Sequence, residues 1–378
     1  MFRTVRDIPL IKGVPILLRS ALNVPVEGGE VTDTYRLHRA LPTIQFLLGH
    51  GARLVIAGHI GRAETETLLS VHRYLSQFVP LFFSPESSGP QVEKKVKELR
   101  SGEALLLENL RRDRREITND KSFALELASL ADVFVEDDFD ACHRAHASIV
   151  GVPTLLPSYA GLLLEEEIKE LRKALKPESP SLAVVGGVKF HTKEPALKKL
   201  ITLYDHLFVG GALANDFLAA QGHSLGRSLV SDVSRSLIEP LLKNKGLVLP
   251  VDTVVRNSEG RVRTARVNEI KPDETIMDHG PETLSLLLDL VSKSKTILWN
   301  GPLGNYENGF TEATDTFARA TSNRAGASGF RAVVGGGDTV AVINKLGVLD
   351  SFSFISTGGG AMLEFLAKGT LPGIEILG

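Results

Sequence analysis

The stretch LAVVGGVKFHTK at residues 182–193 decides the fold class of this chain. Four apolar residues precede Gly186 and Gly187, and a segment with helical spacing follows them. This is the pattern of a buried parallel strand that turns tightly into a helix. Lys189 and Lys193 are four residues apart, so one helical turn would bring both ammonium groups to the same side, although a solvated lysine pair fits the spacing equally well. The stretch predicts an α/β fold with cations beside a strand-to-helix turn.

The same pattern repeats along the whole chain, where short apolar runs alternate with longer segments of helical spacing. Helices are expected at 35–48, 92–99 and 164–175. Strands are expected at 14–18, 53–57, 104–107 and 133–135 in the first half, and at 182–185, 207–209, 247–249, 296–299, 332–334 and 352–355 in the second. No fixed-period repeat interrupts this α/β pattern.

Length and composition favour a soluble protein of two domains. The chain has 378 residues, more than the roughly 250–300 at which a single core stops growing. Apolar residues make up 43% and charged residues 23%, which does not fit disorder or a disulfide scaffold. The net charge of −2 gives no support to a general nucleic-acid binder. The single cysteine, Cys142, fits a reducing compartment, so we expect a cytoplasmic protein.

The helix expected at 164–175 is a good candidate for a connector between domains. It begins with three glutamates and ends before Pro177 and Pro180. The uncharged stretch 147–164 is close to the length of a membrane span, but Pro153 and Pro157 favour a connecting segment. Charged residues throughout 1–25 leave no core for a secretion signal.

Cationic and polar side chains follow the expected strands of the first half. Ligands bind outside the carboxyl ends of parallel strands, so these positions are the first candidates for a site. Each arginine alone would fit a solvated surface, but their shared edge favours a small polyanionic metabolite, because guanidinium groups match carboxylate and phosphate geometry. The residues are Arg19, Asn23, Arg36, His59, Arg62, Arg111, His143, Arg144 and His146.

Glycines take these positions in the second half, at 186–187, 210–211, 301 with 304, 335–337 and 358–360. Glycine permits tight turns and leaves backbone N–H groups open to phosphate at a helix N-terminus, and five such turns indicate a nucleotide site. Asp338 directly follows one of them and suits Mg²⁺ on a polyphosphate, with helix capping as the alternative. Neither the P-loop motif nor Gly-x-Gly-x-x-Gly occurs, so the nucleotide site is of another kind.

Together these segments resemble the phosphoglycerate kinase family over essentially the whole chain. The matching segments, in the order and spacing of the family, are RSALNVP at 19–25, Arg36 with ALPTI at 40–44, HIGR at 59–62, LLENLR at 106–111, HRAHAS at 143–148, GGVKFHTK at 186–193, WNGPLG at 299–304, GGGDT at 335–339 and STGGGA at 356–361. So many matches in register make the resemblance specific.

The resemblance implies two doubly wound parallel-sheet domains that face each other across a hinged cleft. Residues 1–155 would bind phosphoglycerate, 156–177 would form the linker, 178–363 would bind the nucleotide, and the tail 364–378 would return to the first domain. The implied reaction is reversible phosphoryl transfer between ATP and 3-phosphoglycerate, giving ADP and 1,3-bisphosphoglycerate. The partners are then these small molecules, with neither nucleic acid nor membrane, and we expect a monomer.

Site residues are carried over by the same resemblance. Those on the phosphoglycerate side are Asn23, Arg36, His59, Ile60, Gly61, Arg62, Arg111, His143 and Arg144. Those on the nucleotide side are Gly187, Lys189, Lys193, Gly211, Gly280, Asn300, Glu307, Gly336, Gly337, Asp338 and Thr339. Glu307 falls on the ribose position and Asp338 on the position that holds Mg²⁺.

Arg36, Lys189 and Lys193 would be the catalytic residues. The carboxylate of the substrate is already ionised at neutral pH and needs no general base, so positioning and charge stabilisation would carry the rate. Arg36 and Lys193 would flank the transferring group when the cleft closes, which would also exclude water.

Two positions depart from the family pattern. Ala21 stands where the family has the aspartate that resembles a ligand for the substrate hydroxyl, and Thr192 replaces another aspartate between the two lysines. These departures leave two alternatives open, a nucleotide-binding homologue with little or no activity and a kinase of a different small carboxylate. A metal hydrolase built on His143 and His146 is disfavoured, because no second ligand cluster accompanies them.

Overall fold

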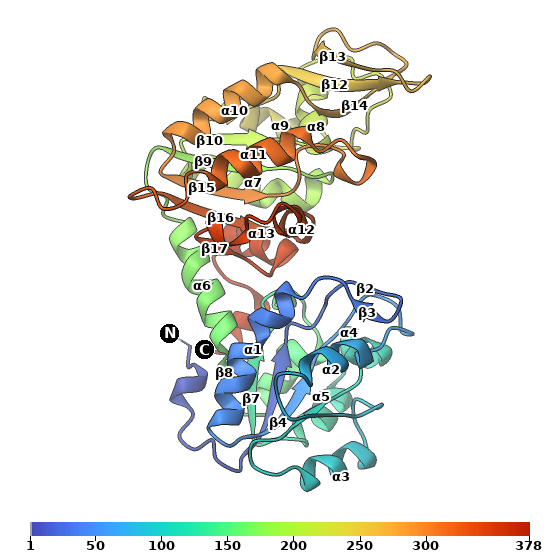
Figure 1. Cartoon of the computed structure of the whole chain (residues 1–378), viewed down its shortest axis with the longest axis vertical. Helices are drawn as coiled ribbons and strands as arrows, with labels where there is room; N and C mark the ends of the chain where they lie inside the picture. The colour runs from blue at the N-terminus through green and yellow to red at the C-terminus, as the bar shows by residue number, and fades with distance from the viewer. Residues whose placement is uncertain (1) are drawn as a thin grey trace. The chain divides into compact units, whose positions relative to one another are not determined.

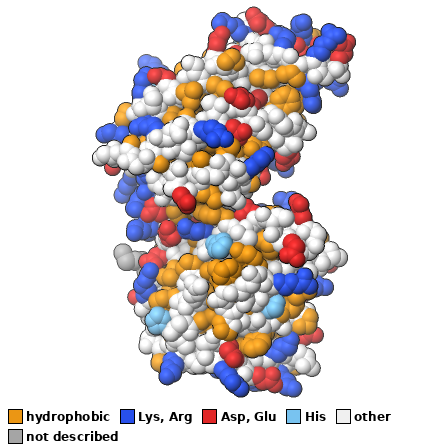
Figure 2. Space-filling model, viewed as in Figure 1, with side chains coloured by type: hydrophobic (Ala, Val, Ile, Leu, Met, Phe, Trp, Pro, Cys, Tyr) orange, Lys and Arg blue, Asp and Glu red, His pale blue; other side chains and the backbone are white. Residues whose placement is uncertain are grey.

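The computed structural model describes residues 2–378, which form two compact units (Figure 1). The first unit runs to Lys169 and takes back Thr370–Gly378, and the second unit is Glu170–Gly369. The division falls inside helix α6 (Leu162–Ala174), the helix expected from the pattern at 164–175. On the face shown in Figure 2, acidic and basic side chains are interspersed over each unit, in keeping with the small net charge.

The first unit is built on a six-stranded sheet in which all neighbouring strands are parallel. In spatial order the strands are β5 (Leu81–Phe83), β6 (Ala104–Leu106), β4 (Arg53–Ala57), β1 (Pro15–Ser20), β7 (Val133–Asp137) and β8 (Ser158–Ala160). The chain first builds outward from β1 through β4 and then returns to the other side at β7. The order of the sheet therefore reverses between β1 and β7, where ligands of such sheets bind.

Alternate residues of these strands supply two separate cores. Leu18 and Ile56 belong to the core that includes Leu37 of α1, whereas Leu17 and Val55 belong to the core that includes Phe123 of α5. This period of two is what a strand buried on both faces requires. The helices of the unit are α1 (Tyr35–Gly49), α2 (Leu69–Leu75), α3 (Pro90–Glu98), α4 (Arg114–Ile117), α5 (Lys121–Ala128) and, in the returning tail, α14 (Pro372–Glu375).

The second unit repeats the doubly wound design. Its parallel sheet has the order β11 (Leu247–Val248), β10 (His206–Val209), β9 (Ser181–Val185), β15 (Thr296–Asn300), β16 (Arg331–Gly335) and β17 (Phe354–Ile355). The order reverses between β9 and β15. Its helices are α7 (Phe190–Leu203), α8 (Ala212–Ala220), α9 (Arg235–Leu242), α10 (Pro281–Lys293), α11 (Glu312–Ser322), α12 (Gly337–Lys345) and α13 (Gly359–Lys368).

The second unit also contains an antiparallel sheet that the sequence pattern did not predict. It consists of β13 (Val262–Arg266), β12 (Asp252–Asn257) and β14 (Glu274–His279). A further two-stranded hairpin, β2 (Val26–Glu27) with β3 (Glu30–Val31), lies in the first unit. The expected strands are all present, the one at 53–57 with the same ends and the others with shifted ends, and the α/β prediction is confirmed.

The stretch 147–164 is a connecting segment, as its prolines predicted. It holds two short helical turns, Ala147–Gly151 and Val152–Thr154, then β8 and the start of α6. Within residues 2–378, each helix falls short of the length or apolar character that a membrane crossing requires.

Candidate active site

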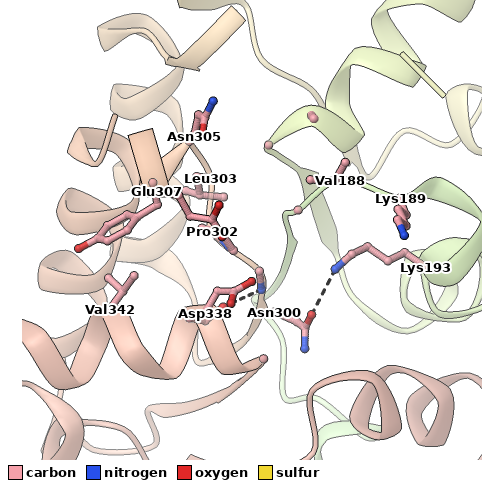
Figure 3. Close-up of a pocket in the computed structure, with 18 of the residues that line it drawn as sticks. Val188, Lys189, Lys193, Asn300, Pro302, Leu303, Asn305, Glu307, Asp338 and Val342 are labelled. Carbon is pink, nitrogen blue, oxygen red and sulfur yellow. Dashed lines mark hydrogen bonds between the residues drawn. The ribbon is translucent and has the colours of Figure 1, made fainter. Parts of the chain in front are cut away.

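A cavity of about 820 Å³ lies in the second unit, at the point where the strand order reverses. Residues that follow β9 and β15 line it, together with the first residues of several helices (Figure 3). Ten of the eleven nucleotide-side residues predicted from the sequence are in its wall: Gly187, Lys189, Lys193, Gly211, Asn300, Glu307, Gly336, Gly337, Asp338 and Thr339.

Gly280 is the nucleotide-side residue that does not line the cavity. It caps the N-terminus of α10, and a Cβ at this position would collide with the carboxylate of Asp252. That carboxylate accepts hydrogen bonds from the backbone N–H groups of Glu282 and Thr283. The close approach explains why glycine occupies position 280, and its neighbour His279 is the residue that reaches the cavity wall.

Four helices begin at this cavity. Gly211 and Ala212 at the start of α8, Asp338 near the start of α12 and Gly359 at the start of α13 line it, as do residues in the first turn of α7. The unpaired N–H groups and the positive dipole ends of these helices favour a polyanion. The strand-end glycines of the second half are therefore brought together as the sequence predicted.

Gly211 shows why glycine is required at one of these turns. Its φ is +65°, and a Cβ would lie 2.7 Å from the backbone nitrogen of Gly187. A side chain would therefore be strained by the backbone conformation and would also collide with the loop that follows β9. The backbone N–H of Gly211 donates to Nε2 of His279 at 3.3 Å, which ties the turn to β14.

Lys193 is a half-buried cation in the wall of the cavity. Its Nζ donates to Oδ1 of Asn300 at 3.4 Å, and Figure 3 shows the ammonium directed to that amide. Lys189 is exposed at the N-cap of α7. The hydroxyl of Thr192 donates to the backbone carbonyl of Lys189 at 3.0 Å. Thr192 therefore makes a hydrogen bond within the first turn of α7 and does not orient a lysine side chain.

The antiparallel sheet contributes a wall of the cavity that the sequence pattern did not predict. Met277, Asp278 and His279 of β14 line the cavity. Burial lowers the pKa of His279 to about 4, so its imidazole is neutral and accepts the hydrogen bond from Gly211. The alternation of apolar and polar residues around the turn NSEG at 257–260 was the available signal for this sheet.

The predicted phosphoglycerate-side residues lie at the carboxyl ends of the strands in the first unit. Asn23 follows β1, Arg36 lies in the first turn of α1, 59–62 follow β4, and Arg111 lies in the short turn after β6. His143 and Arg144 follow β7. We call these nine residues, Asn23, Arg36, His59, Ile60, Gly61, Arg62, Arg111, His143 and Arg144, the basic cluster.

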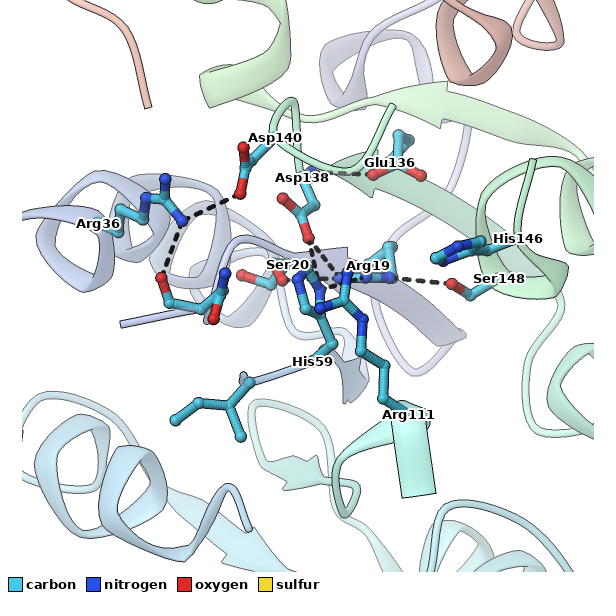
Figure 4. Close-up of polar contacts among 12 residues, drawn as sticks. Arg19, Ser20, Arg36, His59, Arg111, Glu136, Asp138, Asp140, His146 and Ser148 are labelled. Carbon is cyan, nitrogen blue, oxygen red and sulfur yellow. Dashed lines mark hydrogen bonds and ion pairs between the residues drawn. The ribbon is translucent and has the colours of Figure 1, made fainter. Parts of the chain in front are cut away.

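Hydrogen bonds connect much of the basic cluster. Oδ1 of Asn23 accepts the backbone N–H of Gly61 at 2.9 Å, and Nη1 of Arg36 donates to the backbone carbonyl of Asn23 at 2.9 Å. The same Nη1 donates to Oδ2 of Asp140 at 3.0 Å. Arg111 donates to the carbonyl of Gly61. The loops after β1 and β4 and the start of α1 are therefore held as one assembly (Figure 4).

The sequence pattern placed Arg19 among the ligand-facing cations at this edge of the sheet. The structure instead buries it. Its side chain is 1% exposed and donates to Oδ2 of Asp138 at 2.6 Å and to Oγ of Ser148 at 3.0 Å. Its Nη2 lies 2.8 Å from Nδ1 of His59. An arginine can only donate, so Nδ1 is the acceptor and the proton of the imidazole sits on Nε2. Arg19 thus fixes the tautomer of His59.

The remaining arginines of the run 111–115 make surface ion pairs. Arg112 pairs with Glu108, Arg114 with Glu64, and Arg115 with Asp113 and Glu126. This result agrees with the solvated face predicted for them. Exposed pairs of this kind contribute about 0–1 kcal/mol. Of these arginines, only Arg111 belongs to the basic cluster, where it donates to the carbonyl of Gly61.

No group of three or more His, Cys, Asp or Glu side chains that would hold a metal ion by themselves occurs in residues 2–378. The carboxylate of Asp338 is exposed in the first turn of α12 and accepts no hydrogen bond from the part of the chain described. One free carboxylate beside a polyanion site fits Mg²⁺, which takes most of its ligands from phosphates and water.

Comparison with known proteins gives the family. A sequence model described as "Phosphoglycerate kinase" matches residues 5–369. The chain belongs to the phosphoglycerate kinase family. The phosphoglycerate kinase of Rubrobacter xylanophilus is 44% identical over 391 aligned positions, covering 99% of this chain and 98% of that relative. That of Orientia tsutsugamushi (strain Ikeda) is 39% identical over 393 positions, covering 99% and 97%.

Solved phosphoglycerate kinases have the same fold. The structure from Pyrococcus horikoshii OT3 has a TM-score of 0.87 at 30% identity and covers 100% of this chain and 98% of its own. The structure from Coxiella burnetii has a TM-score of 0.82 at 36% identity, with 100% and 99% covered. The chain is thus a phosphotransferase with the two-domain fold of phosphoglycerate kinases, and the resemblance seen in the sequence is confirmed. Neither a non-catalytic homologue nor a kinase of another carboxylate is favoured.

A role of Lys193 in nucleotide binding would make that binding depend on pH. Burial lowers its pKa to about 8, an effect that nearby Asp338 only partly offsets. Bound phosphates favour the charged ammonium and raise this pKa. Below pH 8 the free protein is already protonated there, so ADP affinity should change little. Above pH 8 binding must take up a proton, and the dissociation constant should rise up to about tenfold per pH unit.

Calorimetric titration of ADP at saturating Mg²⁺ between about pH 7 and 9.5 checks this expectation. The control is Lys193→Arg, whose guanidinium stays charged throughout that range and should remove the pH dependence. The same slope in wild type and in Lys193→Arg would rule out Lys193 as the titrating group.

Proposed function

We propose that the second unit binds ATP or ADP in its cavity and that the basic cluster of the first unit binds 3-phosphoglycerate. The γ-phosphoryl group then moves reversibly from ATP to 3-phosphoglycerate, giving ADP and 1,3-bisphosphoglycerate. The observation that carries this proposal is the cavity at which four helices begin around the half-buried cation Lys193. A polyphosphate is the ligand whose charge and length suit several helix N-termini and an ammonium group together.

Binding of the acid is assigned to the basic cluster. Arg36, Arg62, Arg111 and Arg144 supply positive charge for its carboxylate and phosphate groups. Nε2 of His59 carries a proton because of Arg19, so it can donate to an anionic oxygen. Asn23 holds the backbone of Gly61 and leaves its amide N–H₂ for the ligand.

Catalysis would use Arg36, Lys189 and Lys193 to stabilise charge on the transferring group. The acid attacks through a carboxylate that is already ionised, so no general base is needed. Little covalent chemistry falls to the protein in phosphoryl transfer, and positioning and electrostatics carry most of the rate. The reaction requires both ligands to meet in line, so we propose that closure of the hinge is part of the cycle.

Asp338 would hold Mg²⁺ together with the phosphates of the nucleotide, and Glu307, exposed on the cavity wall, would contact the ribose. When bound, the ion would neutralise charge on the phosphates. Gly336, Gly337 and Thr339 place the first turn of α12 there, with Oγ1 of Thr339 accepting the backbone N–H of Gly301 at 2.9 Å.

We further propose that the protein acts as a cytoplasmic monomer. All the residues assigned to the two ligands come from one chain, which supports a monomer. The single cysteine, Cys142, is buried and is not in a disulfide, which supports a reducing compartment.

Binding measurements test the division of ligands between the units. Calorimetric titrations of MgADP and of 3-phosphoglycerate should each give one site per chain, and saturation with either ligand should leave a site for the other. Arg111→Ala should weaken 3-phosphoglycerate roughly 10-fold or more, because a charge-assisted hydrogen bond is lost, and should leave MgADP unchanged. Competition between the two ligands for one site would contradict the proposal.

A further inference from the structure

Ala21 has no polar side-chain atom at the position where the family pattern has aspartate, so this position supplies no hydrogen-bond acceptor to the phosphoglycerate-side site. Ala21 is the residue that follows β1, and it is buried. The parallel register between β1 and β7 pairs Arg19 with Glu136 and Ser20 with Asp137. Ala21 and Asp138 are the residues that directly follow this last pair, at the same edge of the sheet.

Asp138 places a carboxylate at this edge of the sheet. Its Oδ2 accepts from Nη1 of Arg19 at 2.6 Å and lies 3.5 Å from Nδ1 of His59. Its Oδ1 accepts no hydrogen bond from any residue in the range 2–378. Figure 4 shows the carboxylate of Asp138 between His59 and the Arg36–Asp140 pair. One oxygen is thus used by the protein, and the other is left for a ligand.

We propose that Asp138 recognises the C2 hydroxyl of 3-phosphoglycerate, in place of the carboxylate that is absent at Ala21. The inference rests on the proposed binding of 3-phosphoglycerate to the basic cluster. Oδ1 of Asp138 would accept the hydrogen bond of the hydroxyl, while Arg19 holds the carboxylate in place through Oδ2. A carboxylate on one strand is thereby replaced by a carboxylate on the adjacent strand.

Other carboxylates near the site are engaged or buried, apart from Asp140, whose Oδ2 accepts from Arg36. Both oxygens of Glu116 accept from Ser148. Glu136 accepts the backbone N–H of Asp138, and Oδ1 of Asp137 accepts that of Leu164. The remaining oxygens of Glu136 and Asp137 are buried without a partner, whereas neither oxygen of Asp138 is in that state. Oδ1 of Asp138 thus has no hydrogen-bond partner in residues 2–378, and the Asp138 side chain is 1% exposed.

The charge state of Asp138 suits an acceptor. Burial by itself would raise its pKa, but the positive charges of Arg19 and Arg36 hold the pKa well below its usual range. The carboxylate is therefore ionised at neutral pH. Burial has the opposite net effect on Asp137, whose pKa rises to about 8. An ionised acceptor at a nearly water-free position makes a stronger hydrogen bond than an exposed one.

The test compares two ligands that differ only in the C2 hydroxyl, 3-phosphoglycerate and its analogue without that hydroxyl. Wild type should bind 3-phosphoglycerate more tightly than the analogue by roughly 10- to 150-fold, as a hydrogen bond to a charged group implies. Asp138→Ala should bring this ratio of dissociation constants close to one. The double variant Ala21→Asp with Asp138→Ala should restore it, because the carboxylate returns to the neighbouring strand.

Control variants distinguish recognition of the C2 hydroxyl by Asp138 from a purely structural role of Asp138. Asp137→Asn changes the adjacent carboxyl group of β7 and should leave the ratio unchanged. A purely structural role for Asp138 would weaken both ligands equally in Asp138→Ala and keep the ratio, and that result would overturn the inference. A ratio lost in Asp140→Asn but kept in Asp138→Asn would overturn it as well.

Turnover with MgATP, measured on the same preparations, distinguishes failure of the proposed function from failure of this inference. Absence of turnover in wild type would count against the function. Normal turnover with an unchanged ratio in Asp138→Ala would count against the role of Asp138 alone. MgADP affinity should be unchanged in every variant, since the residues that line the nucleotide cavity belong to the second unit.

Discussion

Replacement of Arg36 by alanine is expected to lower kcat by about 10³-fold or more, the size of effect seen when an arginine that stabilises phosphoryl transfer is removed. Arg36 lies in the first turn of α1, where its Nη1 donates to Asn23 and Asp140. The fork leaves further N–H groups for the transferring group. MgADP affinity should stay within about twofold, because the nucleotide cavity contains no residue of the first unit.

Two variants sharpen this prediction. Arg36→Lys keeps the charge but loses the planar fork, and should recover only part of the rate. Arg39→Ala removes the next arginine of α1, which pairs with Glu166, and should leave kcat near wild type. Steady-state kinetics with both substrates varied gives kcat, and calorimetry gives the affinity. An equal loss of kcat and of nucleotide affinity in Arg36→Ala would contradict a role confined to the transfer step.

Replacement of Asp338 by alanine should weaken the binding of MgADP by roughly 100-fold, since a carboxylate ligand of Mg²⁺ contributes several kcal/mol. Binding of ADP without metal should be unchanged or slightly tighter, because a negative charge near the phosphates is removed. The measurement is the ADP dissociation constant with Mg²⁺ and with a chelator.

Asp289→Ala is the matched control, since Asp289 is an exposed acidic residue of the same unit that pairs with Lys293 on α10. It should keep the full difference between ADP with and without Mg²⁺. If Asp338→Ala also keeps that difference, Asp338 does not hold the metal and its carboxylate has another role at the start of α12.

Continuous apolar runs made the parallel sheets predictable. The run at 182–185 has no polar residue, and such a segment between glycine-rich turns is buried on both faces in an α/β fold. The strands of the antiparallel sheet were missed because β12 and β13 mix apolar and polar residues and contain no continuous apolar run. Strand β8 was missed because it is only three residues long and follows Pro157.

Local patterns placed the site residues at the sheet edges but did not show their partners. Arg19 was grouped with the solvent-facing cations because it ends an apolar run. Its burial depends on Asp138, which is 119 residues away in the chain. Gly280 was assigned to the nucleotide, whereas the structure shows its close approach to Asp252. The role proposed for Asp138 likewise needs the register between β1 and β7, which no sequence window contains.

The measurement that tests the central claim most directly is the steady-state rate of 1,3-bisphosphoglycerate formation from MgATP and 3-phosphoglycerate by the wild-type protein, with Ala21→Asp measured beside it. We expect robust turnover in wild type that depends on both substrates. Ala21→Asp should add little, because Asp138 already supplies the carboxylate. Absence of turnover in wild type, whether or not Ala21→Asp restores it, would contradict the account.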